Sequence, residues 1–175
     1  MSPNSPAKML MDYKGGDEVE RRLAVMFDKM NANSKRLIAN TMKKARRLGS
    51  DDHHAFLDYM TEEEISQFLC SQLPVIKLCD GKYMIGTEQK PILVRSDRLL
   101  IRVGGGFVTL EEYLNKNSLS ENIKFSKVMK SQNCSFKEAV KFYLEKHEAP
   151  EKVIQDYLKV EESNSELYEK TMAKI

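Results

Sequence analysis

The chain has 175 residues, with 28 Lys and Arg against 26 Asp and Glu and a formal net charge of +2. It is long enough to bury a real hydrophobic core, and it has no run of about 18 apolar residues that would predict a membrane span. Three scattered cysteines give no disulfide framework, so we expect an intracellular, cytoplasmic protein. Residues 1–16 have no apolar h-region and are expected to form a flexible tail without a signal peptide.

Residues 17–66 are expected to be helical, with a basic half followed by an acidic half. Apolar residues recur at three- to four-residue steps between residues 17 and 48, which predicts an amphipathic helix with a break near residues 31–34. This helix carries seven basic residues and no acidic one from its middle to its end, namely Lys29, Lys35, Arg36, Lys43, Lys44, Arg46 and Arg47. A run from Asp51 to Glu64 then holds only acidic charges.

This charge pattern leaves more than one interpretation open. In the first, the basic and acidic stretches neutralise each other in an antiparallel pair of helices. In the second, the basic face attracts an acidic polymer by steering that weakens with salt. A calmodulin-like target helix is a third interpretation. Nucleic acid is disfavoured, because aromatic residues are not interleaved with the basic ones and no finger or RNA-recognition signature is present.

The next segment predicts one helix and then a small sheet. A capping box at Thr61 and Glu64 predicts a helix over residues 62–72, which Pro74 ends. Asp80-Gly81 lies between apolar runs, which predicts a hairpin of strands 75–79 and 82–85. Two further strands are expected at 91–95 and 99–103. The connections are short and favour antiparallel neighbours, so we expect a four-stranded antiparallel meander.

A glycine tract ends this sheet in the sequence Val103-Gly104-Gly105-Gly106-Phe107. Three glycines allow backbone angles that are closed to other residues. We expect them to turn the strand abruptly into a helix from Leu110 to about residue 116, with Phe107 pointing inward. Thr109 and Glu112 form a capping box for that helix. On this interpretation Gly105→Val would unfold the module.

The order of these motifs resembles the GAR domain of the growth-arrest-specific and spectraplakin families. The likeness covers residues 67–118, with Lys82–Gly86 and Pro91–Arg95 as the first two strands and Phe107 where the family usually has tryptophan. The resemblance implies an α+β fold, in which a small antiparallel meander with a closing helix lies between helical segments at 17–66 and 119–175. It also implies tubulin, in the form of microtubules, as the partner.

Domains of that family typically carry cysteines just before the first strand that help to hold zinc. The aligned positions here are Gln67 and Leu69, and neither Cys70 nor Cys79 belongs to a Cys-x-x-Cys pair. Zinc takes about four ligands in a closed site. We therefore expect no metal and no other cofactor, and we expect the flanking helices to hold the fold by packing.

Residues 119–175 are predicted to be helical. A capping box at Ser135 and Glu138 begins an apolar stripe at residues 139–144, and a second stripe at 153–158 follows the break at Ala149-Pro150. Two such stripes predict an αα-hairpin. The last segment, residues 161–175, is polar enough to be either a docking helix or a frayed tail.

Catalytic motifs are not found, and we expect no enzyme. His53 and His54 are adjacent and cannot form an i, i+4 metal pair, and His147 is expected to be solvated. The glycine tract lacks the Lys-Ser/Thr of a phosphate-binding loop. Cys134 precedes a helix cap, but with no histidine near it in sequence it is expected to be an unreactive thiol. No acidic pair stands in an apolar setting that would suit acid–base work.

These expectations converge on a non-enzymatic cytoskeletal protein that binds microtubules, as a structural component of a stable array such as a cilium axoneme or basal body, alongside other axonemal or cytoskeletal proteins. The outer surface of tubulin is acidic, so contacts are expected from basic residues of the sheet and of the first helix. The candidates are Lys82, Lys90, Arg95, Arg98, Arg102, Lys35, Arg36, Lys43, Lys44, Arg46 and Arg47. The alternative is an adaptor that binds another helical protein, in which the GAR-like sheet is only structural.

Overall fold

The structure is a computed structural model that describes residues 8–9, 18–49, 58–160 and 165–173. The pair His53-His54 and most of the expected tail lie outside the described residues. The fold is α+β, as expected. Its elements are β1 (Lys8–Met9), α1 (Glu18–Arg47), α2 (Glu62–Gln72), β2 (Val75–Cys79), β3 (Lys82–Ile85), β4 (Glu88–Arg95), β5 (Arg98–Val103), β6 (Gly106–Thr109), α3 (Leu110–Gln132), α4 (Phe136–Lys146), α5 (Glu151–Lys159) and α6 (Ser165–Ala173).

The sheet has one antiparallel strand more than expected. Strands β2 to β6 form an antiparallel meander in sequence order, and β1 pairs in parallel with β2 at the edge. The additional strand is β6, which comes directly after the glycines and pairs with β5. The prediction of four strands was wrong because the residues of β6 were assigned to a strand-to-helix turn.

The glycine tract makes a tight hairpin between β5 and β6. Val103 lies opposite Gly106, so Gly104 and Gly105 form the two-residue connection. Of the three glycines, Gly104 has a left-handed φ of +52°, and a Cβ built on any of them would meet nothing within 4 Å. A left-handed first position is what a type II′ hairpin turn requires. The structure therefore gives no support to the expectation that Gly105→Val unfolds the module.

Two helices are longer than the sequence indicated. Helix α1 runs unbroken for 30 residues, because at the expected break Ser34 is buried against α2 and accepts a hydrogen bond from Ser71 Oγ at 3.2 Å. Helix α3 does not end near residue 116 but continues to Gln132, with a total length of 23 residues. Asn122 and Phe125 in its second half are buried, so the helix packs against both the sheet and the C-terminal helices.

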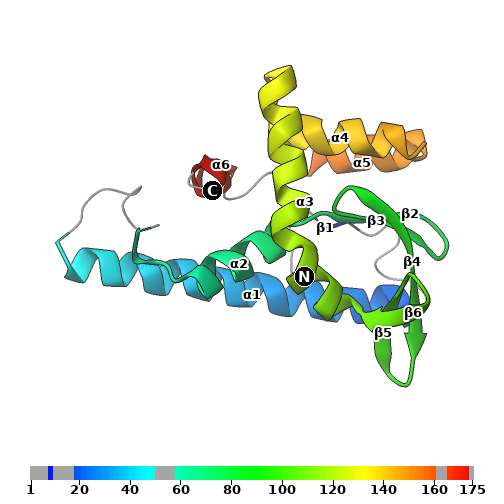
Figure 1. The fold of residues 1–175 in the computed structure, drawn as a ribbon, viewed down its shortest axis with the longest axis horizontal. Coiled ribbons are helices and arrows are strands. Elements are labelled where there is room, and N and C mark those ends of the chain that lie inside the picture. The colour runs from blue at the N-terminus through cyan, green and yellow to red at the C-terminus, as the bar shows by residue number, and fades with distance from the viewer. Residues whose placement is uncertain (1–7, 10–17, 50–57, 161–164, 174–175) are drawn as a thin grey trace.

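The helices close the core around the sheet. Figure 1 shows α1 lying across the lower half of the molecule, α3 standing upright, and α4 beside α5 near the upper half of α3. The main cluster joins Phe27 of α1, Tyr83 of β3, Phe125 of α3 and Tyr157 of α5. This arrangement confirms the expected αα-hairpin of α4 and α5.

A second, smaller cluster lies between the end of α1, α2 and α6. It contains Ala45, Phe68, Leu69, Tyr168 and Met172. Tyr168 is 2% exposed, so the last described segment is a docked helix and not a frayed end. None of the helices in the described part of the chain is long and apolar enough to cross a bilayer.

Candidate protein-interaction surface

Strands β4 to β6 present one face to the core and the other to solvent, because successive side chains of a strand alternate. On the core side, Ile92 and Ile101 lie opposite each other and are almost fully buried. The cross-strand pairs place a second set of side chains together on the outer side. We call this set the arginine face: Leu93, Arg95, Arg98, Leu100, Arg102 and Phe107.

The arginine face has a defined geometry. Arg95 lies directly opposite Arg98 at the end of the β4–β5 hairpin, and Arg102 lies opposite Phe107. The guanidinium carbon of Arg95 is 5.2 Å from the centroid of the Phe107 ring, a cation–π contact that reaches from β4 to β6. Leu93 and Leu100 are half-buried between these groups.

Phe107 does not point inward, which corrects the expectation from the sequence. It is 42% exposed. The cause is the strand β6: Phe107 shares the outer face with its partner Arg102, whereas the next residue, Val108, lies opposite the buried Ile101. An aromatic side chain is therefore displayed among arginines on the surface.

Positive charge on this face is not neutralised within the described part of the chain. None of the ion pairs there includes Arg95, Arg98 or Arg102. Like charges that lie directly opposite each other on neighbouring strands are unfavourable. The nearest acidic residue in sequence, Asp97, binds Arg22 of α1 instead, with Oδ1 2.9 Å from Nη2. An anionic partner would relieve the repulsion between Arg95 and Arg98.

The other sheet candidates do not join this set. Lys82 is exposed at the start of β3, opposite Pro91. Lys90 is half-buried, with Nζ 5.8 Å from the centroid of the Tyr113 ring in α3. Burial raises the pKa of Tyr113 to about 12, and the charges of Glu121 and Glu88 act in the same direction. Five basic residues of the sheet were predicted from the sequence to form one contact surface. The structure brings three of them together, namely Arg95, Arg98 and Arg102.

The seven basic residues of α1 from Lys29 to Arg47 are all exposed. Four of them recur at steps of seven, seven and four residues, which places them along one side of the helix over about 27 Å. We call Lys29, Arg36, Lys43 and Arg47 the basic stripe. Lys35 and Arg46 lie on another side, and Lys44 lies next to the stripe. Within the described ranges, no basic residue of α1 from 29 onward pairs with Glu62, Glu63 or Glu64, so the neutralisation that the first interpretation describes is not seen between these residues.

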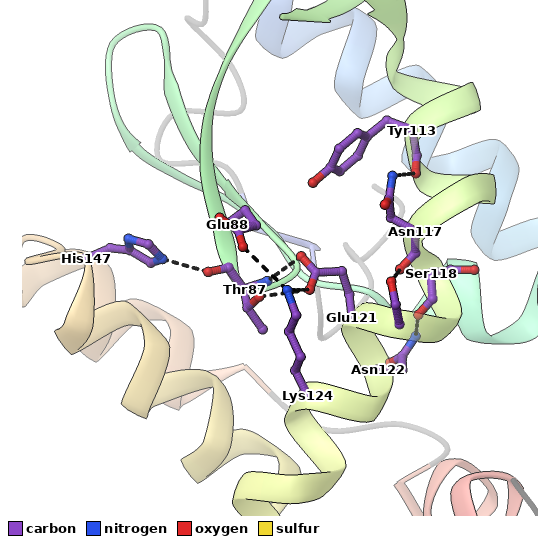
Figure 2. Close-up of polar contacts among 10 residues, drawn as sticks. Thr87, Glu88, Tyr113, Asn117, Ser118, Glu121, Asn122, Lys124 and His147 are labelled. Carbon is purple, nitrogen blue, oxygen red and sulfur yellow. Dashed lines mark hydrogen bonds and ion pairs between the residues drawn. The ribbon is translucent and has the colours of Figure 1, made fainter. Parts of the chain in front are cut away.

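The turn between β3 and β4 is held by a polar cluster that the sequence did not reveal (Figure 2). Glu121 of α3 is 2% exposed and accepts hydrogen bonds from Thr87 Oγ1 at 2.8 Å and Thr87 N at 3.3 Å. Lys124 Nζ lies 2.9 Å from the same carboxylate, and this hydrogen bond raises the pKa of Lys124. A buried carboxylate is thus present, but it is fully engaged in holding the sheet to α3.

His147 joins this cluster from the end of α4 and is not solvated as expected. Its Nε2 lies 2.7 Å from the carbonyl oxygen of Thr87, so this nitrogen must be the donor. The sequence signal that could have indicated the cluster is Gly86. It has a φ of +59°, and a Cβ there would lie 3.0 Å from Glu121 Cγ. Close packing against α3 thus requires glycine at this position.

A buried ion pair connects α1 to strand β2. Glu20 and Lys77 are 3% and 5% exposed, and the Lys77 ammonium binds the Glu20 carboxylate directly. It also contacts Asp80 Oδ1 at 3.1 Å. Burial disfavours the charge of Lys77, but the hydrogen bonds to Glu20 and Asp80 outweigh it and raise its pKa. This pair fixes the register of α1 against β2.

The donor atoms present do not fit the zinc site that the family resemblance suggests. Leu69 is buried in the smaller core cluster, and Cys70 Sγ lies 3.7 Å from Asn115 Oδ1. No group of three or more His, Cys, Asp or Glu side chains converges anywhere in the described residues. Burial, together with the charge of Glu138, raises the pKa of the Cys134 thiol and disfavours its thiolate form.

The part of the chain that carries the sheet matches a known protein family. Residues 57–121 match the model of the Growth-Arrest-Specific Protein 2 Domain. The chain thus contains a growth-arrest-specific protein 2 domain. The match starts ten residues earlier than the likeness found in the sequence. The domain therefore includes α2, β2 to β6 and the first half of α3.

The same region is similar to several curated proteins. GAS2-like protein 1 of Mus musculus and of Homo sapiens are each 42% identical to the chain over 64 residues, which is 35% of this chain and 9% of theirs. GAS2-like protein 2 of Mus musculus is 37% identical over 68 residues, which is 37% of this chain and 8% of the relative. The chain thus spans less than a tenth of these relatives. No solved structure matches it. The arginine face lies within the growth-arrest-specific protein 2 domain, whereas α1 and α4 to α6 lie outside it.

Proposed function

We propose that the protein is a non-enzymatic, cytoskeleton-associated protein that binds microtubules through the arginine face. The growth-arrest-specific protein 2 domain supports a cytoskeleton-associated role. The observation that carries the proposal is the set of Arg95, Arg98 and Arg102 around an exposed Phe107, with no acidic residue among them. Guanidinium groups bind carboxylates through two parallel hydrogen bonds, which suits them to the acidic surface of tubulin.

Cosedimentation with microtubules at low and at physiological salt tests this function. The triple variant Arg95→Glu, Arg98→Glu, Arg102→Glu is expected to lose pelleting at both salt concentrations. A matched control, Lys116→Glu, Lys127→Glu, Lys130→Glu, changes the net charge equally at exposed positions of α3 and should pellet almost normally. Absence of pelleting by the unmodified protein at low salt would refute the function, and equal loss in both variants would refute the site.

The basic stripe has a secondary role in this proposal. Its four side chains are exposed and lie along one side of a helix whose one aromatic residue, Phe27, is fully buried, so α1 offers them no exposed aromatic neighbour of the kind Phe107 provides. Such a stripe acts mainly by long-range attraction, which salt screens over about 8 Å at physiological ionic strength. Reversal of Lys43 and Arg47 should therefore weaken pelleting at low salt and change it little at physiological salt.

Cytoplasmic microtubules, and stable arrays such as the axoneme or basal body of a cilium, are the proposed location. Fluorescence microscopy of the tagged protein in ciliated cells tests it, with the arginine-face triple variant as the control for specific recruitment. Signal that is diffuse for both proteins would contradict the location.

An adaptor function has one observation in its favour. An open groove of about 1470 Å³ runs between α1, α2 and the start of α3. It is lined by apolar Met26 and Met30, by basic Lys29 and Arg36 of α1, and by acidic Glu111 and Glu112 at the start of α3. Such a groove suits an amphipathic helix of another protein. Loss of all microtubule pelleting together with retained protein partners in cells would favour this function.

A further inference from the structure

We propose that the arginine face binds a flexible, glutamate-rich peptide segment in an extended conformation, with two carboxylates spaced four residues apart and an apolar side chain midway between them. The inference rests on the proposed function, since it states which part of an acidic polymer this face would contact. It concerns a local recognition site, so it can be tested with peptides alone.

The spacing of the arginines supplies the first argument. Arg98 and Arg102 lie four residues apart on β5, which corresponds to about 14 Å along a strand at 3.4 Å per residue. An extended peptide that lies along β5 has the same rise, so its residues i and i+4 reach the two arginines. Arg95 lies opposite Arg98 and supplies a second guanidinium to the first carboxylate.

The apolar residues between the arginines supply the second argument. Leu100 lies midway between Arg98 and Arg102, and Leu93 lies directly opposite it on β4. Both are half-buried, so part of each side chain remains available for contact. Residue i+2 of the peptide points at this pair, which favours an aliphatic side chain there. The phosphate groups of a polyanion carry no aliphatic side chain that could contact these leucines. The face therefore fits a peptide better.

The third argument is that the face is held in place before binding. The Arg95 guanidinium rests against the Phe107 ring at 5.2 Å, and the hairpin end is tied to α1 through the Asp97 and Arg22 pair. Figure 1 shows the β4–β5 hairpin projecting beyond the other elements, where a flexible segment has access to it. Side chains that are ordered in advance lose less conformational entropy on binding.

Fluorescence anisotropy with the full chain tests the proposal. The probe is a labelled peptide with the core Glu-Gly-Leu-Gly-Glu, compared with Gln-Gly-Leu-Gly-Gln, with the rearranged core Glu-Glu-Gly-Leu-Gly and with inorganic polyphosphate. The first peptide should bind at least about tenfold more tightly than either peptide control, a difference of about 1.4 kcal/mol. Polyphosphate should bind more weakly at physiological salt than the first peptide.

Variants of the face make the result specific. Arg95→Gln with Arg98→Gln should weaken the first peptide by about tenfold or more, and Arg102→Lys should weaken it because lysine keeps the charge but not the paired hydrogen bonds. Circular dichroism confirms that each variant remains folded. Equal binding of the glutamine peptide or of the rearranged peptide, or no binding of the first peptide, overturns the inference. If microtubules still pellet in that case, the proposed function stands, and peptide binding without pelleting refutes the function alone.

Discussion

Arg22 of α1 binds the end of the β4–β5 hairpin through Asp97, which is 75 residues away in sequence. Nη2 lies 2.9 Å from Asp97 Oδ1, and Nη1 donates to the Asp97 carbonyl oxygen at 3.0 Å. The hairpin end needs this support, because Ser96 and Asp97 both have left-handed φ values, 51° and 61°, which residues other than glycine rarely adopt. A helix outside the growth-arrest-specific protein 2 domain thus fixes the position of Arg95 and Arg98.

This contact should affect binding to microtubules. Arg22→Gln and Asp97→Asn should each weaken pelleting, and the double variant should bind no worse than Arg22→Gln alone, since Arg22→Gln already removes the ion pair that Asp97→Asn disrupts. Asn is chosen at position 97 because it tolerates a left-handed φ. Lys127→Gln removes a charge far from the arginine face and is the control. A double variant whose loss equals the sum of the two single losses would show that the residues act separately.

Gly86→Ala should be strongly destabilising. Its left-handed φ costs roughly 1–2 kcal/mol for a residue with a side chain. Its Cβ would also displace the buried Glu121 carboxylate from Thr87, at a further cost of about 1–3 kcal/mol. Gly81→Ala has a similar φ of +79° but open space around the Cβ, so only the backbone cost applies. Urea denaturation measures both, and equal losses would refute the steric role of Glu121.

The buried ion pair of Glu20 and Lys77 predicts a large effect on stability. Lys77→Met leaves the Glu20 carboxylate buried without the ammonium, which should lower the free energy of unfolding by about 3–5 kcal/mol. Adding Glu20→Leu should recover part of this loss, because the site is then apolar on both sides. A double variant that is less stable than Lys77→Met would contradict this account.

The pH dependence of the same pair has a definite sign. The pKa of Lys77 is raised in the folded protein, so the stabilisation from its charge is fully present below the unfolded value of about 10.4. It is lost only as the pH rises beyond that value toward the folded pKa. The stability difference between the unmodified protein and Lys77→Met should thus stay constant from neutral pH to about pH 10 and shrink above it. A difference that shrinks below pH 9 would contradict this origin.

Glu148→Gly should stabilise the protein. Helix α4 ends in a Schellman motif, in which Ala149 N donates to Leu144 O at 2.9 Å and Glu148 N donates to Glu145 O at 3.0 Å. Glu148 occupies the left-handed position of this motif with a φ of 55°, where glycine is preferred. The gain should be about 1 kcal/mol, seen as a higher melting temperature. Glu145→Gly, inside α4, is the control and should lower it.

The elements that the sequence predicted correctly are those set by local signals. Thr61 and Glu64 form the full capping box of α2, and Asp80-Gly81 connects β2 and β3 as expected. The cap of α3 is only half of the expected box, since Thr109 accepts from Glu112 N at 3.1 Å without a described return bond.

Features that depend on distant partners could not be predicted from the sequence. The continuity of α1 depends on its contact with Ser71 of α2. The course of α3 past residue 116 depends on its packing with the C-terminal helices. The position of His147 depends on Thr87, which is 60 residues away in sequence. The same holds for the candidate site. Basic residues were identified by type, but their grouping depended on the pairing of β6, which also turned Phe107 outward.

Because α3 is unbroken, its length fixes the rotation of the C-terminal helices about the helix axis relative to the sheet. The matched domain ends at residue 121, in the middle of this helix, and each residue of an α-helix advances the chain by 1.5 Å and turns it by about 100°. One residue inserted after position 124 would therefore swing the α4–α5 hairpin about a quarter turn around the axis and carry His147 away from Thr87. In this chain the domain and the C-terminal helices share one continuous helix. Either part can be exchanged for another only if the number of residues in α3 keeps their relative rotation about the helix axis.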